Sequence, residues 1–146
     1  HFYIVGQWPT AAVRALAGPA VSVTGYVSDI RPYIMNSAVY VVPMRMGSGT
    51  KLKVMEAMAM GIPVVSTSLG AEGIDVVAGE HLHLADTPAD FAHAVVTLLN
   101  DSRERQRLAS NARRLVEEKY DWTTIVPSLE AIYTKALISA TAGGQG

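Results

Sequence analysis

The sequence predicts an α/β fold in which a doubly wound parallel sheet is covered by helices on both faces. Three observations lead to this expectation. The apolar runs are short and continuous, as in strands that are buried on both sides. Helical segments separate them, so strand and helix alternate along the chain. The 146 residues, 49% of them hydrophobic, suffice for one compact domain with a sizeable core.

Each expected strand is an apolar run that ends near Gly, Pro, Ser, Thr or Asp, where a turn can form. Between the runs lie stretches with helical character. The expected strands are residues 2–5, 21–24, 38–43, 63–67 and 81–85, and the expected helices are 10–17, 29–36, 50–60 and 88–99.

Two further helices are expected after Asn100. Residues 102–119 are rich in Arg, Glu, Leu and Ala, with an apolar stripe at Leu108, Ala112, Leu115 and Val116. Residues 121–138 carry a second stripe, in which Pro127 must lie in the first turn or produce a kink. We therefore predict one domain over residues 1–140 and a flexible tail over 141–146.

Composition excludes several classes of protein. The chain has no cysteine, which excludes a disulfide scaffold and a thiolate metal site, and the four histidines show no ligand spacing. The net charge of −1 provides no general field for nucleic acid. The longest apolar runs stop near seven residues, where a membrane span needs about 20. The chain opens on an apolar run without an initiator methionine, so we expect a segment of a longer protein.

The loop after the third strand is the main candidate for chemistry, because ligands of doubly wound sheets bind at the carboxyl ends of strands. Gly47 and Gly49 allow backbone N–H groups to approach a ligand closely, and the next helix points its positive end the same way. Arg45, Lys51 and Lys53 add three cations, and Glu56 shares a helix face with Lys53. The loop is therefore a candidate phosphate cradle.

Other interpretations of these residues stay open. Gly-x-Gly before a helix is also common in plain tight turns, and a Lys-Glu pair three residues apart is often only a solvated surface pair. The loop matches neither a P-loop nor a dinucleotide fingerprint. A second glycine loop at 66–73 could line the same crevice or be a plain connection. The loop that starts at Gly25 places Tyr26 where it could pack on a base or on the core.

The segment PMRMGSGTKLKVMEAMAMGIPVVST at 43–67 resembles the donor-binding segment of family 4 retaining glycosyltransferases, which have the two Rossmann-like lobes called GT-B. The segment VTGYVSD at 23–29 also agrees with that family, and Tyr120-Asp121-Trp122 followed by Tyr133 is similar to its closing helices. The resemblance covers residues 2–133. It implies the C-terminal, nucleotide-sugar-binding lobe of a bacterial-type transferase, with the acceptor lobe on the rest of the parent chain.

The resemblance also implies roles for particular residues. Glu56 stands at the second Glu of the family's E-x7-E motif, which holds the ribose hydroxyls of the donor. At the first Glu this chain has Ser48, or Gly47 if the loop is one residue longer, and neither is an acid. Ser48, Gly49 and Thr50 would contact the sugar or a phosphate, and the backbone at Tyr26 and Val27 would border the nucleobase.

A second departure from the family concerns the start of the lobe. The family's first strand and helix carry an Arg and a Lys that stabilise the leaving diphosphate, and this chain begins with what resembles the following strand. We therefore expect the chain alone to be inactive, with no catalytic residue of its own. The expected substrate is a UDP-, GDP- or ADP-linked sugar, with no cofactor and no essential metal.

The remaining expectations concern partners and alternatives. The parent enzyme is expected in the cytoplasm, with peripheral attachment to the inner membrane face if its acceptor is lipid-linked, and the last helix could drive self-association of the isolated chain. One alternative is a sugar-nucleotide epimerase lobe, which would carry more acids and histidines. The other is a non-catalytic nucleotide- or phosphate-binding or regulatory module on a flavodoxin-like sheet, which would cluster aspartates at strand ends.

Overall fold

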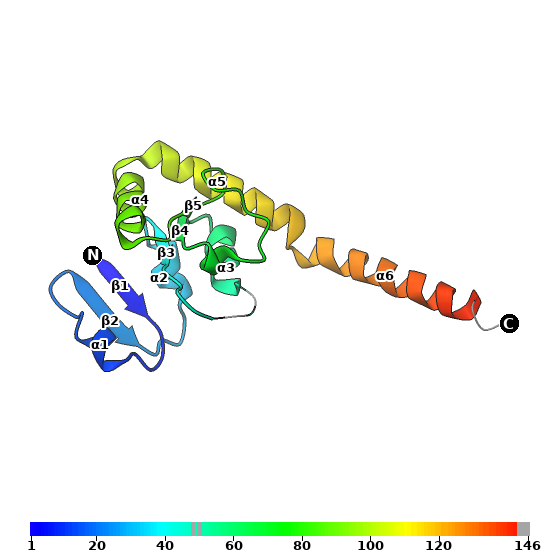
Figure 1. Cartoon of the computed structure of the whole chain (residues 1–146), viewed down its shortest axis with the longest axis horizontal. Helices are drawn as coiled ribbons and strands as arrows, with labels where there is room; N and C mark the ends of the chain where they lie inside the picture. Colours follow the sequence, from blue (N-terminus) through cyan, green and yellow to red (C-terminus); the bar gives the residue numbers. More distant parts are fainter. Residues whose placement is uncertain (48, 50, 143–146) are drawn as a thin grey trace.

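The computed structural model describes residues 1–47, 49 and 51–142, and its elements alternate between strand and helix as expected (Figure 1). The strands are β1 (Phe2–Val5), β2 (Val21–Gly25), β3 (Tyr40–Val42), β4 (Val64–Ser66) and β5 (His83–Leu84). The helices are α1 (Ala11–Arg14), α2 (Arg31–Met35), α3 (Leu52–Ala59), α4 (Pro88–Asn100), α5 (Ser102–Lys119) and α6 (Trp122–Ala142), with a 3₁₀ turn, η1 (Leu69–Ala71). The α/β class and the five strand positions are confirmed, although β3, β4 and β5 are shorter than expected.

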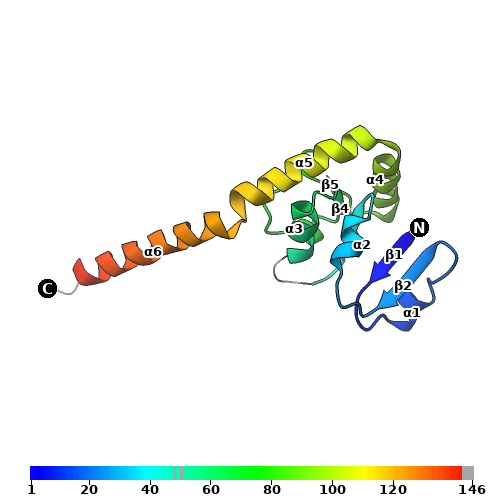
Figure 2. The ribbon, with the colours of Figure 1, turned by 180° about the vertical axis from the view of Figure 1, so that it is seen from behind.

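Every strand pair is parallel, but the sheet is divided into two parts. β1 pairs with β2, whereas β3, β4 and β5 form a separate sheet in that order. Both views place β1 between β2 and the rest of the molecule (Figures 1 and 2). The predicted number of strands and their parallel direction are therefore confirmed. In the described part of the chain, however, β1 and β3 do not pair, so the strands form two sheets rather than one.

The buried core lies entirely beside the three-stranded sheet. Its larger cluster joins residues of α2, β3, α3, β4 and α5, and a smaller one joins β4, α4 and α5. β1 and β2 contribute no fully buried side chain: Phe2 is 46% exposed and Tyr3 is 54% exposed. The core residues include Ile34, Val42, Val54, Ala57, Met58, Val64, Val65, Leu82, Leu98, Leu108 and Ala112.

The two helices that cover the core begin at well-formed caps. The Thr87 hydroxyl accepts a hydrogen bond from the Asp90 N–H at the start of α4. The Asp101 carboxylate accepts from the N–H groups of Arg103 and Glu104, both at 3.0 Å, at the start of α5. Each cap satisfies backbone donors that the first helical turn leaves unpaired. The predicted α5 stripe is confirmed, since its Leu108, Ala112 and Leu115 positions are buried.

The last helix extends away from the body, as both ribbon views show (Figures 1 and 2). Its residues 122–138 are all exposed, including the apolar stripe expected there. Pro127 lies inside the helix rather than in its first turn. The helix reaches Ala142, so Thr141 and Ala142, expected in a flexible tail, are helical. No helix in the described part of the chain has the length and apolar character needed to cross a membrane.

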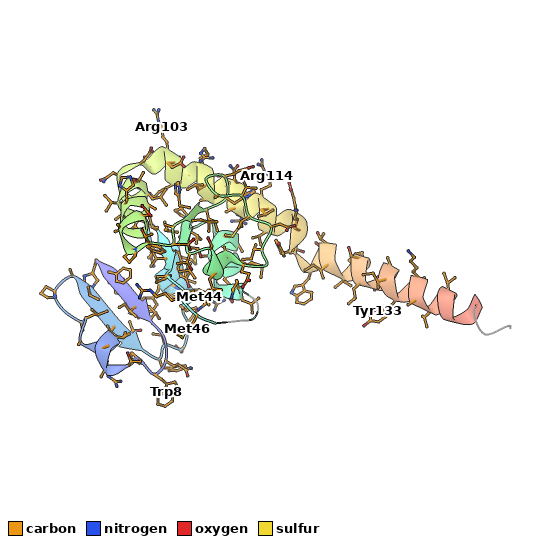
Figure 3. The ribbon with its side chains drawn as sticks, viewed as in Figure 1. Trp8, Met44, Met46, Arg103, Arg114 and Tyr133 are labelled. Atoms are coloured by element: carbon orange, nitrogen blue, oxygen red, sulfur yellow. The ribbon has the colours of Figure 1, made fainter. Side chains whose placement is uncertain are left out.

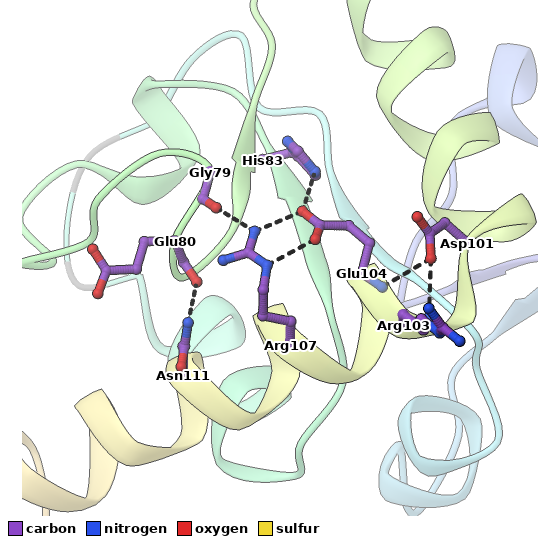
Figure 4. A network of polar contacts seen from close by, with 8 residues as sticks. All are labelled: Gly79, Glu80, His83, Asp101, Arg103, Glu104, Arg107 and Asn111. Atoms are coloured by element: carbon purple, nitrogen blue, oxygen red, sulfur yellow. Dashed lines mark hydrogen bonds and ion pairs between the residues drawn. The ribbon is translucent and has the colours of Figure 1, made fainter.

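A polar network ties α5 to the turn before β5 (Figure 4). The Arg107 guanidinium donates to the Gly79 carbonyl at 2.6 Å and to both oxygens of Glu104 at 2.7 and 2.8 Å. The Asn111 amide donates to the Glu80 carbonyl at 3.2 Å. The hydrogen bond from Arg107 lowers the pKa of Glu104 below its ordinary value. The carboxylate form of Glu104 is therefore favoured in the folded chain.

This shift predicts part of the acid sensitivity of the fold. Because the folded pKa of Glu104 is depressed, its contribution to stability is present above the ordinary value of 4.5 and is lost as pH falls through the folded pKa. We expect Glu104→Gln to lower stability at pH 7 and to flatten the decline of stability below about pH 4.5. Urea unfolding at several pH values measures this. Glu118→Gln, at an exposed position of α5, is the control, and an equal flattening there would contradict the assignment.

The buried turn after β4 predicts a second stability effect. A Cβ at Gly70 would overlap the Ser66 hydroxyl oxygen and lie 3.1 Å from both Cγ1 and the carbonyl oxygen of Val42. Gly70→Ala should therefore destabilise the fold by about 1–3 kcal/mol, measured by denaturant titration. Gly18→Ala is the matched control, since its Cβ would meet no atom within 4 Å. Equal stabilities of the two variants would show that the turn after β4 moves aside freely.

Candidate functional site

The loops that leave β3 and β4 are held together at the carboxyl edge of the three-stranded sheet. The Thr67 N–H donates to the Val42 carbonyl at 3.2 Å, and the Thr67 hydroxyl donates to the Met44 carbonyl at 2.7 Å. The same hydroxyl accepts from the Gly70 N–H at 3.1 Å. Both loops therefore leave the sheet in fixed directions, at the edge where ligands of such sheets bind.

The glycine loop then runs from Met44 toward α3. Gly47 has φ = +126° and Gly49 has φ = +91°, conformations that side chains other than glycine rarely adopt. The labelled Met44 and Met46 mark its start (Figure 3). Ser48 and Thr50, which we predicted as donor contacts, lie outside the described residues. The backbone at both glycines thus requires residues without a side chain, while their predicted approach to a ligand stays a prediction.

Lys51 is the unusual residue at the end of this loop. Only 4% of it is exposed, and its ammonium nitrogen has no hydrogen-bond partner among the described residues. α3 begins at the next residue and has no side-chain cap, so its first N–H groups are also without a side-chain acceptor. A buried, unpaired polar group is rare in folded proteins. An anion at this place would satisfy both the ammonium group and the helix end.

Glu56 and Lys53 lie on α3 with exposed side chains. No ion pair joins them in the described part of the chain, and both side chains are solvated on the surface of the helix. Burial, and then the negative charge of Glu56, raise the pKa of the Tyr40 phenol. Glu56 is thus close enough to Tyr40 to act on it electrostatically, while its side chain remains exposed.

A cleft of about 620 Å³ lies at the carboxyl ends of β3, β4 and β5. Its polar lining includes Arg45, Thr67 and Asp86. The Asp86 carboxylate accepts from the Ser68 hydroxyl at 2.7 Å and from the Ser68 N–H at 2.8 Å, and these bonds lower its pKa. Thr67 and Leu69, from the second glycine loop, thus line a cleft together with Arg45.

A second pocket, of about 450 Å³, lies at the carboxyl ends of β1 and β2. Tyr26 lines it and is 69% exposed, whereas Val27 is half-buried and does not line it. Trp8 and Arg14 line the same pocket. Among the described residues, the structure thus places Tyr26 in one pocket, Arg45 in another, and Lys51, Lys53 and Glu56 in neither.

The sequence did not point to Asp86 or Trp8 as site residues. Asp86 follows β5 and enters the site only because β5 pairs with β4, a register that sequence spacing does not give. Trp8 follows β1, and an aromatic residue after a strand is more often part of a core. Its position directly after the strand end was the available signal. Within the described ranges, no group of three His, Asp or Glu residues comes together as a metal site would require.

Comparison with known proteins agrees with this architecture. A family model described as "Glycosyl transferases group 1" matches residues 1–101. The chain is 32% identical over 145 residues to the phosphatidyl-myo-inositol mannosyltransferase of Mycobacterium leprae, covering 94% of this chain and 38% of that protein. It is 36% identical over 99 residues to the MMP alpha-(1→4)-mannosyltransferase of Mycolicibacterium hassiacum, covering 64% of this chain and 24% of that protein. The chain thus spans little more than a third of these relatives, or less.

Solved structures share the fold. Sucrose-phosphate synthase from Thermosynechococcus elongatus superposes with a TM-score of 0.77 at 24% identity, covering 94% of this chain and 38% of that one. The C-terminal domain of a group 1 glycosyl transferase, LpcC, from Francisella tularensis gives 0.64 at 26% identity, covering 70% and 54%. Anabaena HepE in complex with UDP gives 0.77 at 18% identity, covering 91% and 40%.

The family match covers more than half of the chain, and the solved neighbours share its arrangement of parallel strands and helices. The chain therefore belongs to the group 1 glycosyl transferases and has the fold of a GT-B C-terminal lobe.

Proposed function

We propose that this chain is the donor-binding half of a retaining, family 4 glycosyltransferase, which transfers a sugar from a nucleotide-diphosphate sugar to an acceptor. The observation that carries the proposal is the buried Lys51 ammonium group, which has no partner among the described residues and lies between the glycine loop and the start of α3. A diphosphate supplies the negative charge that this cation and the free backbone N–H groups require.

The ribose fits a different group of the same helix. Glu56 lies five residues after Lys51, and its carboxylate is exposed. A carboxylate only accepts hydrogen bonds, so the two adjacent hydroxyl groups of a ribose would be suitable donors for it. Arg45, Lys53 and Gly49 are the further donor contacts that we propose around the phosphates and the sugar, together with Ser48 and Thr50. The HepE structures with UDP and with UDP-glucose support a nucleotide sugar as substrate.

The parent protein completes the enzyme in this proposal. Sugar transfer requires stabilisation of the departing diphosphate and orientation of the acceptor. An N-terminal acceptor-binding lobe orients the acceptor. The exposed apolar face of α6 packs against that lobe in the parent protein. In the isolated chain the same face drives self-association. The chain alone is then inactive. We place the parent enzyme in the cytoplasm, at the inner membrane face if its acceptor is lipid-linked.

We also infer that an additional strand of the parent chain lies between β1 and β3. Three observations support this. The sheet is divided at that place, β1 faces the body with its free edge, and Phe2 and Tyr3 are exposed although strands of this class are normally buried (Figure 1). With an inserted strand, the order becomes the common doubly wound order, in which the ligand crevice lies beside that strand.

Nucleotide binding tests the proposed function. We expect UDP, GDP or ADP to raise the melting temperature of the chain and to shift the amide NMR signals of residues after β3. Lys51→Met, which keeps the volume but removes the charge, should weaken binding by about 10- to 150-fold, the equivalent of about 1.5–3 kcal/mol for a hydrogen bond to a charged group. Glu56→Ala should also weaken it, because the ribose loses its acceptor.

Arg103→Met is the matched control, because it removes an exposed cation in the first turn of α5 (Figure 3). It should leave the affinity unchanged. If no nucleotide binds at millimolar concentration, or if Arg103→Met weakens binding as much as Lys51→Met, the phosphate site is not where we place it.

Hydrogen exchange tests the inserted strand. The Phe2 N–H donates to the Ala20 carbonyl and the Tyr40 N–H to the Pro63 carbonyl, so in these parallel strands the Tyr3, Val5 and Val41 amides point to the open edges. We expect these three amides to exchange quickly in the 146-residue chain and slowly in the parent protein. The Tyr40 amide, which already has a partner, serves as the reference. Equal exchange of Tyr3 in both proteins would argue against the strand.

A further inference from the structure

The cleft of about 620 Å³ at the carboxyl ends of β3, β4 and β5 contains one cation and one carboxylate, Arg45 and Asp86. Both side chains are exposed, and no ion pair joins them in the described part of the chain. Lys51, Lys53 and Glu56 do not line this cleft, so the nucleotide contacts that we propose at those residues leave it free. Opposite charges that share a cleft without pairing can both bind one ligand.

The Asp86 carboxylate is held in place and still has room for a ligand. One of its oxygens accepts a hydrogen bond from the Ser68 N–H at 2.8 Å, and the other accepts from the Ser68 hydroxyl at 2.7 Å. These bonds lower the pKa of Asp86, which favours its ionised form. Each carboxylate oxygen can accept two hydrogen bonds, so each keeps one acceptor position for a donor outside the protein.

The apolar wall of the cleft is also fixed by the fold. It consists of Met44, Leu69 and Phe91, all of which are half-buried. Phe91 packs against the smaller core cluster, and the Thr67 hydroxyl donates to the Met44 carbonyl at 2.7 Å. Met44 also marks the place where the cleft adjoins the glycine loop (Figure 3). A wall that is already ordered lowers the cost of binding a ligand.

This combination of groups selects the class of ligand. Asp86 would repel an anionic ligand, and Arg45 would repel a cationic one. A wholly apolar ligand would displace water from both charges without replacing its hydrogen bonds. The hydroxyl groups of a sugar both donate to a carboxylate and accept from a guanidinium, and its C–H faces pack on apolar side chains. An uncharged sugar ring therefore satisfies every part of the cleft.

We propose that this cleft holds an uncharged sugar ring of the acceptor, with Asp86 accepting its hydrogen bonds and Arg45 donating to it. The inference rests on the proposed function, in which the acceptor must lie close to the donor sugar. The cleft meets this requirement because it begins at Met44 and Arg45, at the start of the glycine loop. The acceptor site is thus shared between this chain and the N-terminal lobe of the parent protein.

NMR titration with simple glycosides tests the sugar site. The probes are the methyl α-D-pyranosides of glucose, mannose and galactose, which carry no charge and differ in the orientation of their hydroxyl groups. At high millimolar concentration, we expect at least one of them to shift the amide signals of Leu69, Asp86 and Phe91. The amide signals of Trp8 and Tyr26, which line the second pocket, should stay unchanged.

Two variants place the glycoside in the cleft. Ala92 is exposed and lines the cleft, so Ala92→Trp fills it without removing a buried side chain and should abolish the shifts. His93→Trp is the matched control, because His93 is the next residue of α4, is exposed and does not line the cleft. It should bind glycosides as the wild type does.

The third variant tests the carboxylate itself. Asp86→Asn should weaken glycoside binding by about 10- to 150-fold, because the hydrogen bonds from the sugar no longer reach a charged group. Unchanged affinity of Asp86→Asn would contradict the proposed role of Asp86. The melting temperature of each variant shows whether it is folded under the conditions of the titration.

Nucleotide sugars distinguish an acceptor sugar from the donor sugar. UDP-glucose and GDP-mannose are compared with UDP and GDP on the wild type and on Ala92→Trp. We expect Ala92→Trp to bind all of these nucleotides as the wild type does. If it weakens a nucleotide sugar and not the corresponding nucleotide, the donor sugar occupies the cleft and the acceptor inference is wrong.

The remaining outcomes separate this inference from the function on which it rests. If nucleotides bind and no glycoside shifts the signals of the cleft, the inference is wrong and the proposed function stands. If His93→Trp abolishes the shifts as Ala92→Trp does, the glycoside does not occupy the cleft, which also overturns the inference. If glycosides bind in the cleft and no nucleotide binds, the proposed function fails and the acceptor role fails with it.

Discussion

The hydrogen bonds of Thr67 are the constraint on which the geometry of the candidate site depends. Its N–H and hydroxyl hold the carbonyls of Val42 and Met44, and its hydroxyl oxygen accepts the N–H of Gly70. One buried residue after β4 thereby fixes the exit of β3 and the turn that follows β4. The first residues of the glycine loop and the cleft beside Arg45 adjoin this junction. The absence of space for a Cβ at Gly70 is another consequence of the same tight packing.

Charge is distributed at this edge in a way that suits a ligand more than the protein itself. Partly buried carboxylates such as Glu104 and Asp29 have arginine partners, which contribute to the fold. Lys51 is buried without such a partner, and Arg45 and Glu56 have no ion pair among the described residues. A fold optimised only for stability would pair or remove a buried cation, because its desolvation is costly. Lys51, unlike the exposed Arg45 and Glu56, therefore carries a cost in the isolated chain that the proposed phosphate site would offset.

The sequence predicted most of the local structure and only part of the site. Apolar runs and glycine positions located the five strands and the loop after β3, since these features depend on nearby residues alone. Lys51 and Lys53 are equivalent in the sequence, yet one is buried and the other exposed, because burial depends on how α3 packs on the core. Asp86 and Thr67 line the same cleft because β5 pairs with β4, and the spacing of residues in the sequence does not reveal that pairing. Trp8 has a special backbone conformation that no property of tryptophan would suggest.

The division of the sheet links stability to binding. A two-stranded parallel sheet without buried side chains contributes little stability of its own, so the unit of β1, α1 and β2 depends on contacts outside itself. A ligand that contacts both this unit and the glycine loop would join the unit to the core. The affinity for that ligand would then be lowered by the free-energy cost of fixing the β1–α1–β2 unit relative to the core. A strand between β1 and β3 would fix the two parts before the ligand binds and so remove that cost. Preorganisation by the parent chain is thus a physical reason for the same residues to bind more tightly in the whole enzyme than in the isolated lobe.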